Sequence, residues 1–159
     1  MKVRIFIVFI VTLVIIQLFY MLSFKTPKVL AIHGLGSNKD LLIKNMPFTD
    51  SNKIKWWDNN GVKLISSSQT YYVSVWNFDG KYQKLAPKSS GWFPDHDIDY
   101  LLCFNDIKAE ENCIDKENWI IDIIKAKDGY IYYRLDGNEY YRKPSGELID
   151  GERFKTTIK

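Results

Sequence analysis

The longest pattern in the chain is an apolar run near its amino terminus. Residues 5–24 contain no Asp, Glu, Lys or Arg, and Thr12 and Gln17 are the polar positions in its middle. A helix of this length rises about 30 Å, which matches the hydrocarbon core of a bilayer. The pattern therefore predicts a transmembrane helix over 5–24, which would make the membrane itself a partner of the chain.

The flanks of this run favour an uncleaved signal-anchor over a cleavable signal peptide. The apolar core exceeds the roughly 7–15 residues of a signal peptide, and bulky residues occupy the place of a small-residue cleavage site. Lys2 and Arg4 on the short tail favour a cytoplasmic amino terminus. We expect a single-pass protein of the bacterial inner membrane, with tail and anchor over 1–24 and a periplasmic α+β domain over 25–159.

After the anchor, the apolar positions predict a hairpin and then a helix. Segments 28–32 and 41–46 are short apolar runs on either side of a glycine-containing turn. The side-chain oxygens of 49–51 can cap a helix that carries Ile54 and Trp57 on one face.

Residues 70–78 have the most regular alternation in the chain. Val73 and Val75 fall on one side, whereas Ser74 and Trp76 fall on the other. This spacing predicts a β-strand.

The carboxyl-terminal part alternates between β-branched or aromatic runs and turn signals. Runs 119–125, 130–135 and 139–143 predict a meander of antiparallel strands, and the Gly- and Pro-containing segment 79–97 predicts a long loop. The predicted fold class is α+β, with one N-terminal transmembrane helix followed by a small, mostly antiparallel sheet domain with one or two helices.

Charge and composition exclude one class of partner. The net charge is +3, and the basic residues near the carboxyl terminus are interrupted by acidic ones. Nucleic-acid binding needs Lys and Arg gathered on one face. The sequence therefore predicts no nucleic-acid partner.

The two cysteines, Cys103 and Cys113, make an even pair. In an oxidising compartment such a pair is expected to form a disulfide, which contributes roughly 2–3 kcal/mol by restricting the unfolded chain. A metal pair and a redox dithiol fit less well, because zinc ligands cluster at shorter spacing and redox motifs are C-x-x-C.

The motif VLAIHGLGS, which contains His33, is similar to the segment that builds the oxyanion hole of α/β-hydrolases. That chemistry also needs a serine on a G-x-S-x-G turn, followed by an acid and a histidine. No such turn follows, so the hydrolase interpretation is a remote alternative and no catalytic residues are predicted.

His96 lies among Asp95, Asp97 and Asp99, and such a group could in principle bind a divalent metal or perform acid–base chemistry. Neighbouring residues in an extended loop point in different directions, which favours an exposed acidic loop. The sequence predicts no metal and no cofactor, and it predicts that His33 and His96 are dispensable.

Several segments together resemble one known family, the enterobacterial putative membrane proteins grouped as the domain-of-unknown-function family numbered 943. The segments are LLIKNMPFTDSNKIKWWDNN, VSVWNFDGKY, YLLCFNDIKAEENCIDKEN and YYRLDGNEYYRKPSGELI. The resemblance implies a small inner-membrane protein with an extracytoplasmic domain, and it brings no catalytic residues.

Three functions are compatible with these patterns. The preferred one is a protein-binding domain, for example an immunity protein that neutralises an envelope-targeting toxin, with Trp56, Trp57 and Trp92 as possible interface residues. The alternatives are an accessory or structural subunit of a membrane complex and, remotely, an enzyme.

Overall fold

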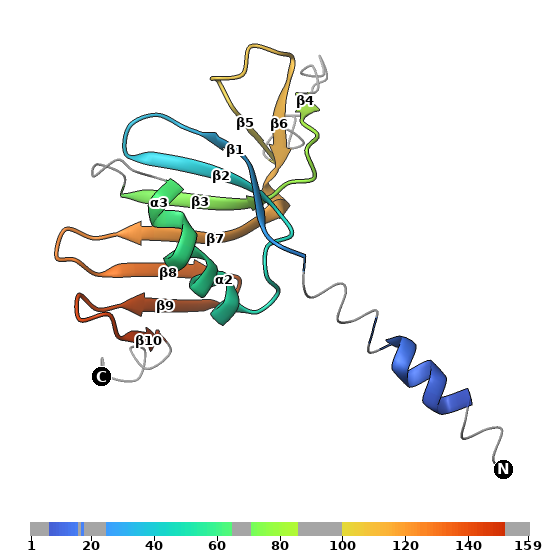
Figure 1. Ribbon diagram of the computed structural model, residues 1–159. Coiled ribbons are helices and arrows are strands. Elements are labelled where there is room, and N and C mark those ends of the chain that lie inside the picture. Colours follow the sequence, from blue (N-terminus) through green and yellow to red (C-terminus); the bar gives the residue numbers. More distant parts are fainter. Residues whose placement is uncertain (1–6, 16, 18–24, 65–70, 86–99, 152–159) are drawn as a thin grey trace, which may run out of the picture.

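The computed structural model describes residues 7–15, 17, 25–64, 71–85 and 100–151 (Figure 1). Seven strands form the main sheet in the order β1–β2–β3–β7–β8–β9–β10. In that order the strands are Lys28–His33, Asn38–Lys44, Tyr72–Asn77, Trp119–Lys125, Ile131–Leu135, Asn138–Arg142 and Leu148–Asp150.

The pairing in the main sheet is antiparallel except between β2 and β3, which run parallel. A parallel pair needs a long crossover connection, and here the helical segment between β2 and β3 provides it. The predicted amino-terminal hairpin and the predicted carboxyl-terminal meander are both confirmed.

The helical crossover consists of α2 (Asp50–Trp56), the π-helical turn η1 (Trp57–Gly61) and α3 (Val62–Leu64). Thr49 caps α2, because its side-chain oxygen accepts a hydrogen bond from the Asn52 backbone N–H at 3.4 Å. The predicted helix and its predicted cap are therefore confirmed.

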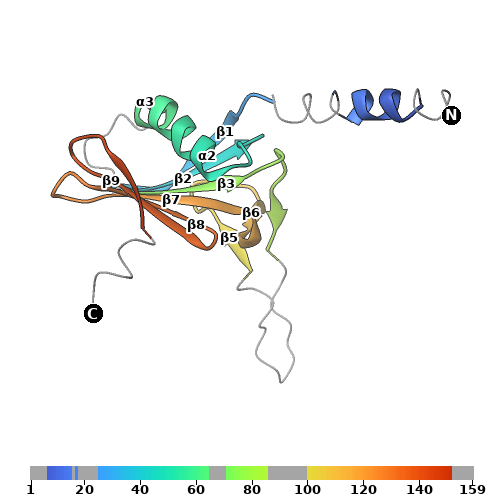
Figure 2. The same cartoon turned by 90° about the horizontal axis from the view of Figure 1, so that it is seen from below.

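A second sheet of three short strands packs on the other side of the main sheet. Its order is β4–β6–β5, with β4 at Gln83–Lys84, β5 at Leu101–Cys103 and β6 at Glu111–Asp115, and the short 3-10 helix η3 (Lys116–Asn118) leads from β6 into β7. Figure 2 shows α2 and α3 over one face of the main sheet and β5 and β6 under the opposite face. The sequence did not predict this small sheet.

The predicted disulfide is present in the small sheet. Cys103 and Cys113 are bonded and face each other across β5 and β6. Cys113 is completely buried.

Both faces of the main sheet are covered, and the residues that the structure describes form two hydrophobic cores. Strand β3 contributes Val73 and Val75 to the core under the helices, whereas Trp76 packs into the core under the small sheet. The predicted alternation of β3 is thus confirmed, and both of its faces are buried.

The prediction of a transmembrane helix over 5–24 is wrong for this structure. Among the described residues, the helical backbone in this region covers 7–15 and 17, and no described helix is long and apolar enough to cross a bilayer. Apolar composition favours transfer into lipid, but composition alone does not form a membrane-spanning helix.

Candidate functional site

His33 lies at the end of β1, where the main sheet meets the small sheet. Gly34 ends the strand with φ at +95°, and a Cβ atom there would lie 2.6 Å from the Asn38 carbonyl oxygen. This glycine therefore lets the chain turn sharply. The Lys39 ammonium group donates a hydrogen bond to the Gly34 carbonyl oxygen at 2.8 Å, which stabilises the turn. His33 itself is only 7% exposed.

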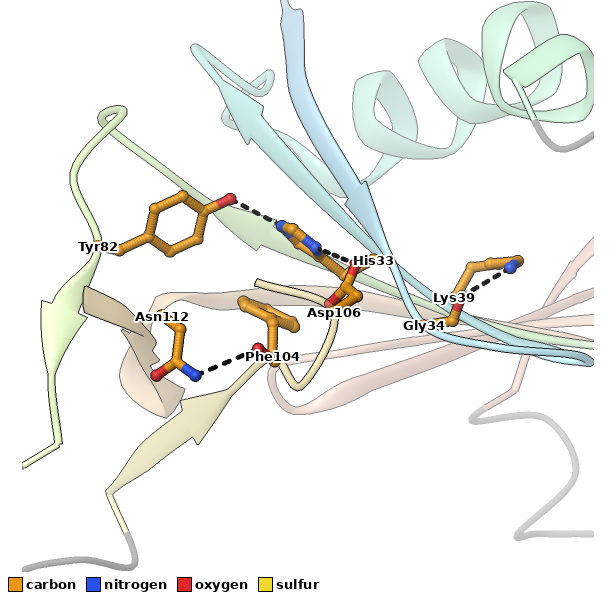
Figure 3. A network of polar contacts seen from close by, with 7 residues as sticks. All are labelled: His33, Gly34, Lys39, Tyr82, Phe104, Asp106 and Asn112. Carbon is orange, nitrogen blue, oxygen red and sulfur yellow. Dashed lines mark hydrogen bonds and ion pairs between the residues drawn. The ribbon is translucent and has the colours of Figure 1, made fainter. Parts of the chain in front are cut away.

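Three side chains from the small-sheet side enclose the imidazole of His33 (Figure 3). Its Nδ1 lies 2.8 Å from Asp106 Oδ2, and its Nε2 lies 2.7 Å from the Tyr82 hydroxyl. The Phe104 ring stacks on it, with 4.1 Å between ring centroids. We call His33, Tyr82, Phe104 and Asp106 the junction cluster.

The partners determine which nitrogen of His33 carries hydrogen. An ionised Asp106 carboxylate can only accept, so Nδ1–H donates to it, and Nε2 of the neutral ring then accepts from the Tyr82 O–H. The hydrogen bond from His33 lowers the pKa of Asp106 below its ordinary value. Burial, and then the negative charge of Asp106, raises the pKa of Tyr82.

Tyrosine, histidine and aspartate in a line resemble the relay of a nucleophilic triad, but the environment favours a different role. A nucleophile is activated when its anion is stabilised, whereas the pKa of Tyr82 is raised. A cleft of about 320 Å³ is lined by Asn77, Phe78, Asp79, Lys81, Gln83, Ile114, Asp115 and Asn118. The junction cluster lies outside this cleft, and its contacts join the end of β1 to segments of the small sheet.

A row of polar residues runs from His33 across six strands of the main sheet. Successive cross-strand partners in the register are His33, Asp40, Ser74, Asp122, Arg134 and Glu139. Directly opposed residues share one face of a sheet, so this polar row lies on the face that also carries the small sheet.

The middle of the polar row is buried and its hydrogen bonds are satisfied. Asp122 Oδ1 accepts from Ser74 Oγ at 2.7 Å and from Trp119 Nε1 at 2.9 Å. Asp40 accepts from Trp76 Nε1 at 2.8 Å, and burial raises its pKa. Hydrogen bonds of this kind offset the cost of burying polar groups, so the row stabilises the arrangement of the strands.

Beyond the row, the same face continues into a cluster of tyrosines on β8 and β9. The rings of Tyr130, Tyr132 and Tyr141 lie 6.1–6.3 Å apart between centroids. Tyr132 is 42% exposed, and its cross-strand neighbours are Ile124 and Tyr141. We define the tyrosine face as Ile124, Tyr130, Tyr132, Arg134, Glu139, Tyr141 and Ile149.

The structure describes two of the three predicted interface residues, Trp56 and Trp57. Trp57 is 5% exposed and lies in the core under the helices, and Trp56 is half-buried against that core. Trp92 lies outside the described residues, as do His96 and its neighbouring aspartates. Among the residues that the structure does describe, no group of His, Cys, Asp and Glu side chains could hold a metal ion.

The prediction that His33 is dispensable rested on the absence of a partner, and the structure shows that this premise is wrong, because His33 contacts Asp106 and Tyr82. Asp106 and Tyr82 are far from His33 in the sequence and belong to loops around the unpredicted small sheet. The available signal was a histidine on an apolar strand, since such a residue needs hydrogen-bond partners when it is buried.

A comparison with protein families identifies the group to which the chain belongs. The family model described as "Enterobacterial putative membrane protein (DUF943)" matches residues 1–151. The chain belongs to this family. The resemblance seen in the sequence is therefore confirmed, and no curated protein and no solved structure matches this DUF943 member.

The junction cluster makes the unfolding free energy of this DUF943 protein depend on pH in the acid range. The folded state holds the pKa of Asp106 below its ordinary value. The ionised Asp106 carboxylate therefore stabilises the fold at any pH above the unfolded pKa of Asp, about 3.9, and this stabilisation is lost as the pH falls through the folded pKa. We expect Asp106→Asn to reduce the decline in unfolding free energy below about pH 4, measured by urea unfolding between pH 7 and 3. Equal declines in wild type and variant would contradict this.

Proposed function

We propose that this member of the DUF943 family is a non-catalytic protein-binding module, and that the tyrosine face is its contact surface. The observation that carries the proposal is the gathering of three tyrosine rings on one sheet surface, where Tyr132 is exposed and Tyr130 and Tyr141 are half-buried. Tyrosine is enriched among the residues that dominate binding energy, because it offers a large apolar ring and a hydroxyl with little side-chain entropy to lose.

The charges around the tyrosines support a protein partner. Arg134 pairs with Glu139 at 3.4 Å, and Lys143 pairs with Glu147 at 3.0 Å. Each pair joins two opposite charges, so these side chains bring both signs to the surroundings of the tyrosines. A surface of this kind suits the mixed apolar and polar character of a protein interface.

The rigid layer beneath the tyrosine face also supports binding. Tyr133 and Leu135, on the same strand as Tyr132, point the other way and are buried at 0% and 3% exposure. A surface held by a packed core loses little conformational freedom on binding.

We further propose that the domain works in the periplasm of the bacterial envelope, which the disulfide supports because disulfides persist in oxidising compartments. An immunity protein against an envelope-targeting toxin is one specific form of this proposal. An accessory subunit of a membrane complex is the other. The identity of the protein bound at the tyrosine face distinguishes the two forms.

The test is site-specific photo-crosslinking of the full chain in its native bacterium. A photoreactive amino acid at Glu139, whose side chain is 64% exposed, should give a discrete adduct with another protein. The matched control at Asn59, an exposed residue of η1 on the helical side, should give none.

A second variant links the adduct to the tyrosines. Adding Tyr132→Ala should reduce the Glu139 adduct about tenfold or more, because a central interface tyrosine often contributes 2 kcal/mol or more. Circular dichroism should show an unchanged fold. If both positions give the same adducts, or if Tyr132→Ala has no effect, the tyrosine face is not the contact surface.

A further inference from the structure

The open end of the β1–β2 hairpin, where β1 begins and β2 ends, carries positive charge. Lys28 of β1 lies directly opposite Lys44 of β2, and both residues are exposed. Segments 25–32 and 41–49 contain these two lysines and Lys25, and they contain no Asp or Glu. These two segments therefore give the open end of the hairpin a basic surface.

An exposed aromatic ring lies close to these lysines. Phe48 is 99% exposed, which is the highest value among the large apolar side chains of the described residues. It follows Lys44 by four residues, which can span at most about 14 Å. Figure 1 shows the start of β1 and the connection from β2 to α2 on the same side of the domain. Removal of this phenyl ring from water would be favourable.

The apolar run over 5–24 ends just before this basic surface. Its described helical residues 7–15 expose apolar side chains all around the helix, among them Val8 at 65% and Phe9 at 61%. Such a helix suits a lipid environment, and the chain belongs to a family described as membrane proteins. Lys28 follows the run by four residues, so the open end of the hairpin stays close to any membrane that takes up the run.

We propose that the open end of the hairpin docks on the surface of an anionic lipid bilayer. Phe48 enters the boundary between headgroups and acyl chains, where the apolar side chains of surface-bound proteins lie. Lys28 and Lys44 lie against the lipid phosphates, because an anionic surface attracts lysines within a Debye length, about 10 Å at 0.1 M salt. The docking surface shares no residue with the tyrosine face, so this proposal does not rest on the proposed function.

The test is photo-crosslinking of the full chain reconstituted in vesicles of phosphatidylcholine and phosphatidylglycerol. A photoreactive phenylalanine analogue at position 48 should form about fivefold more lipid adducts than the same analogue at position 35. Leu35 is the matched control, because it is 87% exposed and lies in the turn at the other end of the hairpin. Equal lipid adducts at both positions, or protein adducts in place of lipid adducts at position 48, would overturn the proposal.

A pair of double variants tests the role of charge. Lys28→Gln combined with Lys44→Gln should lower the lipid adduct at position 48 about fivefold or more, because each lysine adds to the attraction of an anionic surface. The matched control combines Lys125→Gln with Lys127→Gln, two exposed lysines at the opposite end of the main sheet, and should leave the adduct unchanged. An unchanged adduct in the first variant, or equal losses in both, would contradict docking on an anionic surface.

Discussion

Replacing Trp57 by alanine is expected to cost about 3–5 kcal/mol of unfolding free energy, the largest effect of any single substitution proposed for this chain. The indole is 5% exposed and packs in the core under the helices together with Ile54 and the strands of the main sheet. Small domains are stable by only about 5–15 kcal/mol. The variant should therefore lose most of its stability, which far-ultraviolet circular dichroism during thermal unfolding would show.

Two further variants separate this packing effect from a general sensitivity of the helix. A Cβ atom on Gly61 would lie 2.2 Å from Cε3 of the Trp57 ring, so Gly61→Ala should displace the indole and destabilise the domain in the same direction. The matched control is Trp56→Ala, which removes a half-buried indole and should cost only about 1–2 kcal/mol. Equal losses for Trp56→Ala and Trp57→Ala would contradict the assignment of Trp57 to the core.

The second large effect is expected for His33→Ala, at about 2–3 kcal/mol. The substitution removes two hydrogen bonds, leaves a space beside the Phe104 ring, and deprives the partly buried Tyr82 hydroxyl of its partner. For a chain of this size the melting temperature should fall by about 5–10 °C.

A double-mutant cycle with Asp106→Ala tests the physical reason for this loss. The two residues are in contact, so the double variant should be more stable than the sum of the single losses predicts, by about 1 kcal/mol. A His33→Ala loss below about 0.5 kcal/mol, or strictly additive losses, would show that the junction cluster does not hold the sheets together.

Elements that depend on neighbouring residues were predictable from the sequence. The Thr49 cap needs only an oxygen three residues before an available N–H, and the strand β3 needs only alternation. The pairing of Cys103 with Cys113 was likewise predictable, because the chain contains just two cysteines.

The candidate site was not predictable, because it depends on register between distant strands. Strand β2 pairs with β3 across the helical crossover, and this pairing places Asp40 beside Ser74. A shift by one residue would turn every side chain of a strand to the opposite face and would break up the polar row. The tyrosine face, in contrast, lies on strands that follow one another in the meander, where Tyr132 pairs with Ile124 of β7 and with Tyr141 of β9.

The sequence by itself determined the local hydrogen-bonding units of this DUF943 protein: the first hairpin, the capped helix, the meander and the cysteine pair. Only the tertiary structure decided that β2 and β3 run parallel, that a second sheet covers the face opposite the helices, and that His33 is buried between Asp106 and Tyr82. The physical reason is that capping and alternation act between residues a few positions apart. Burial and partner choice are determined by contacts between segments that only folding brings together.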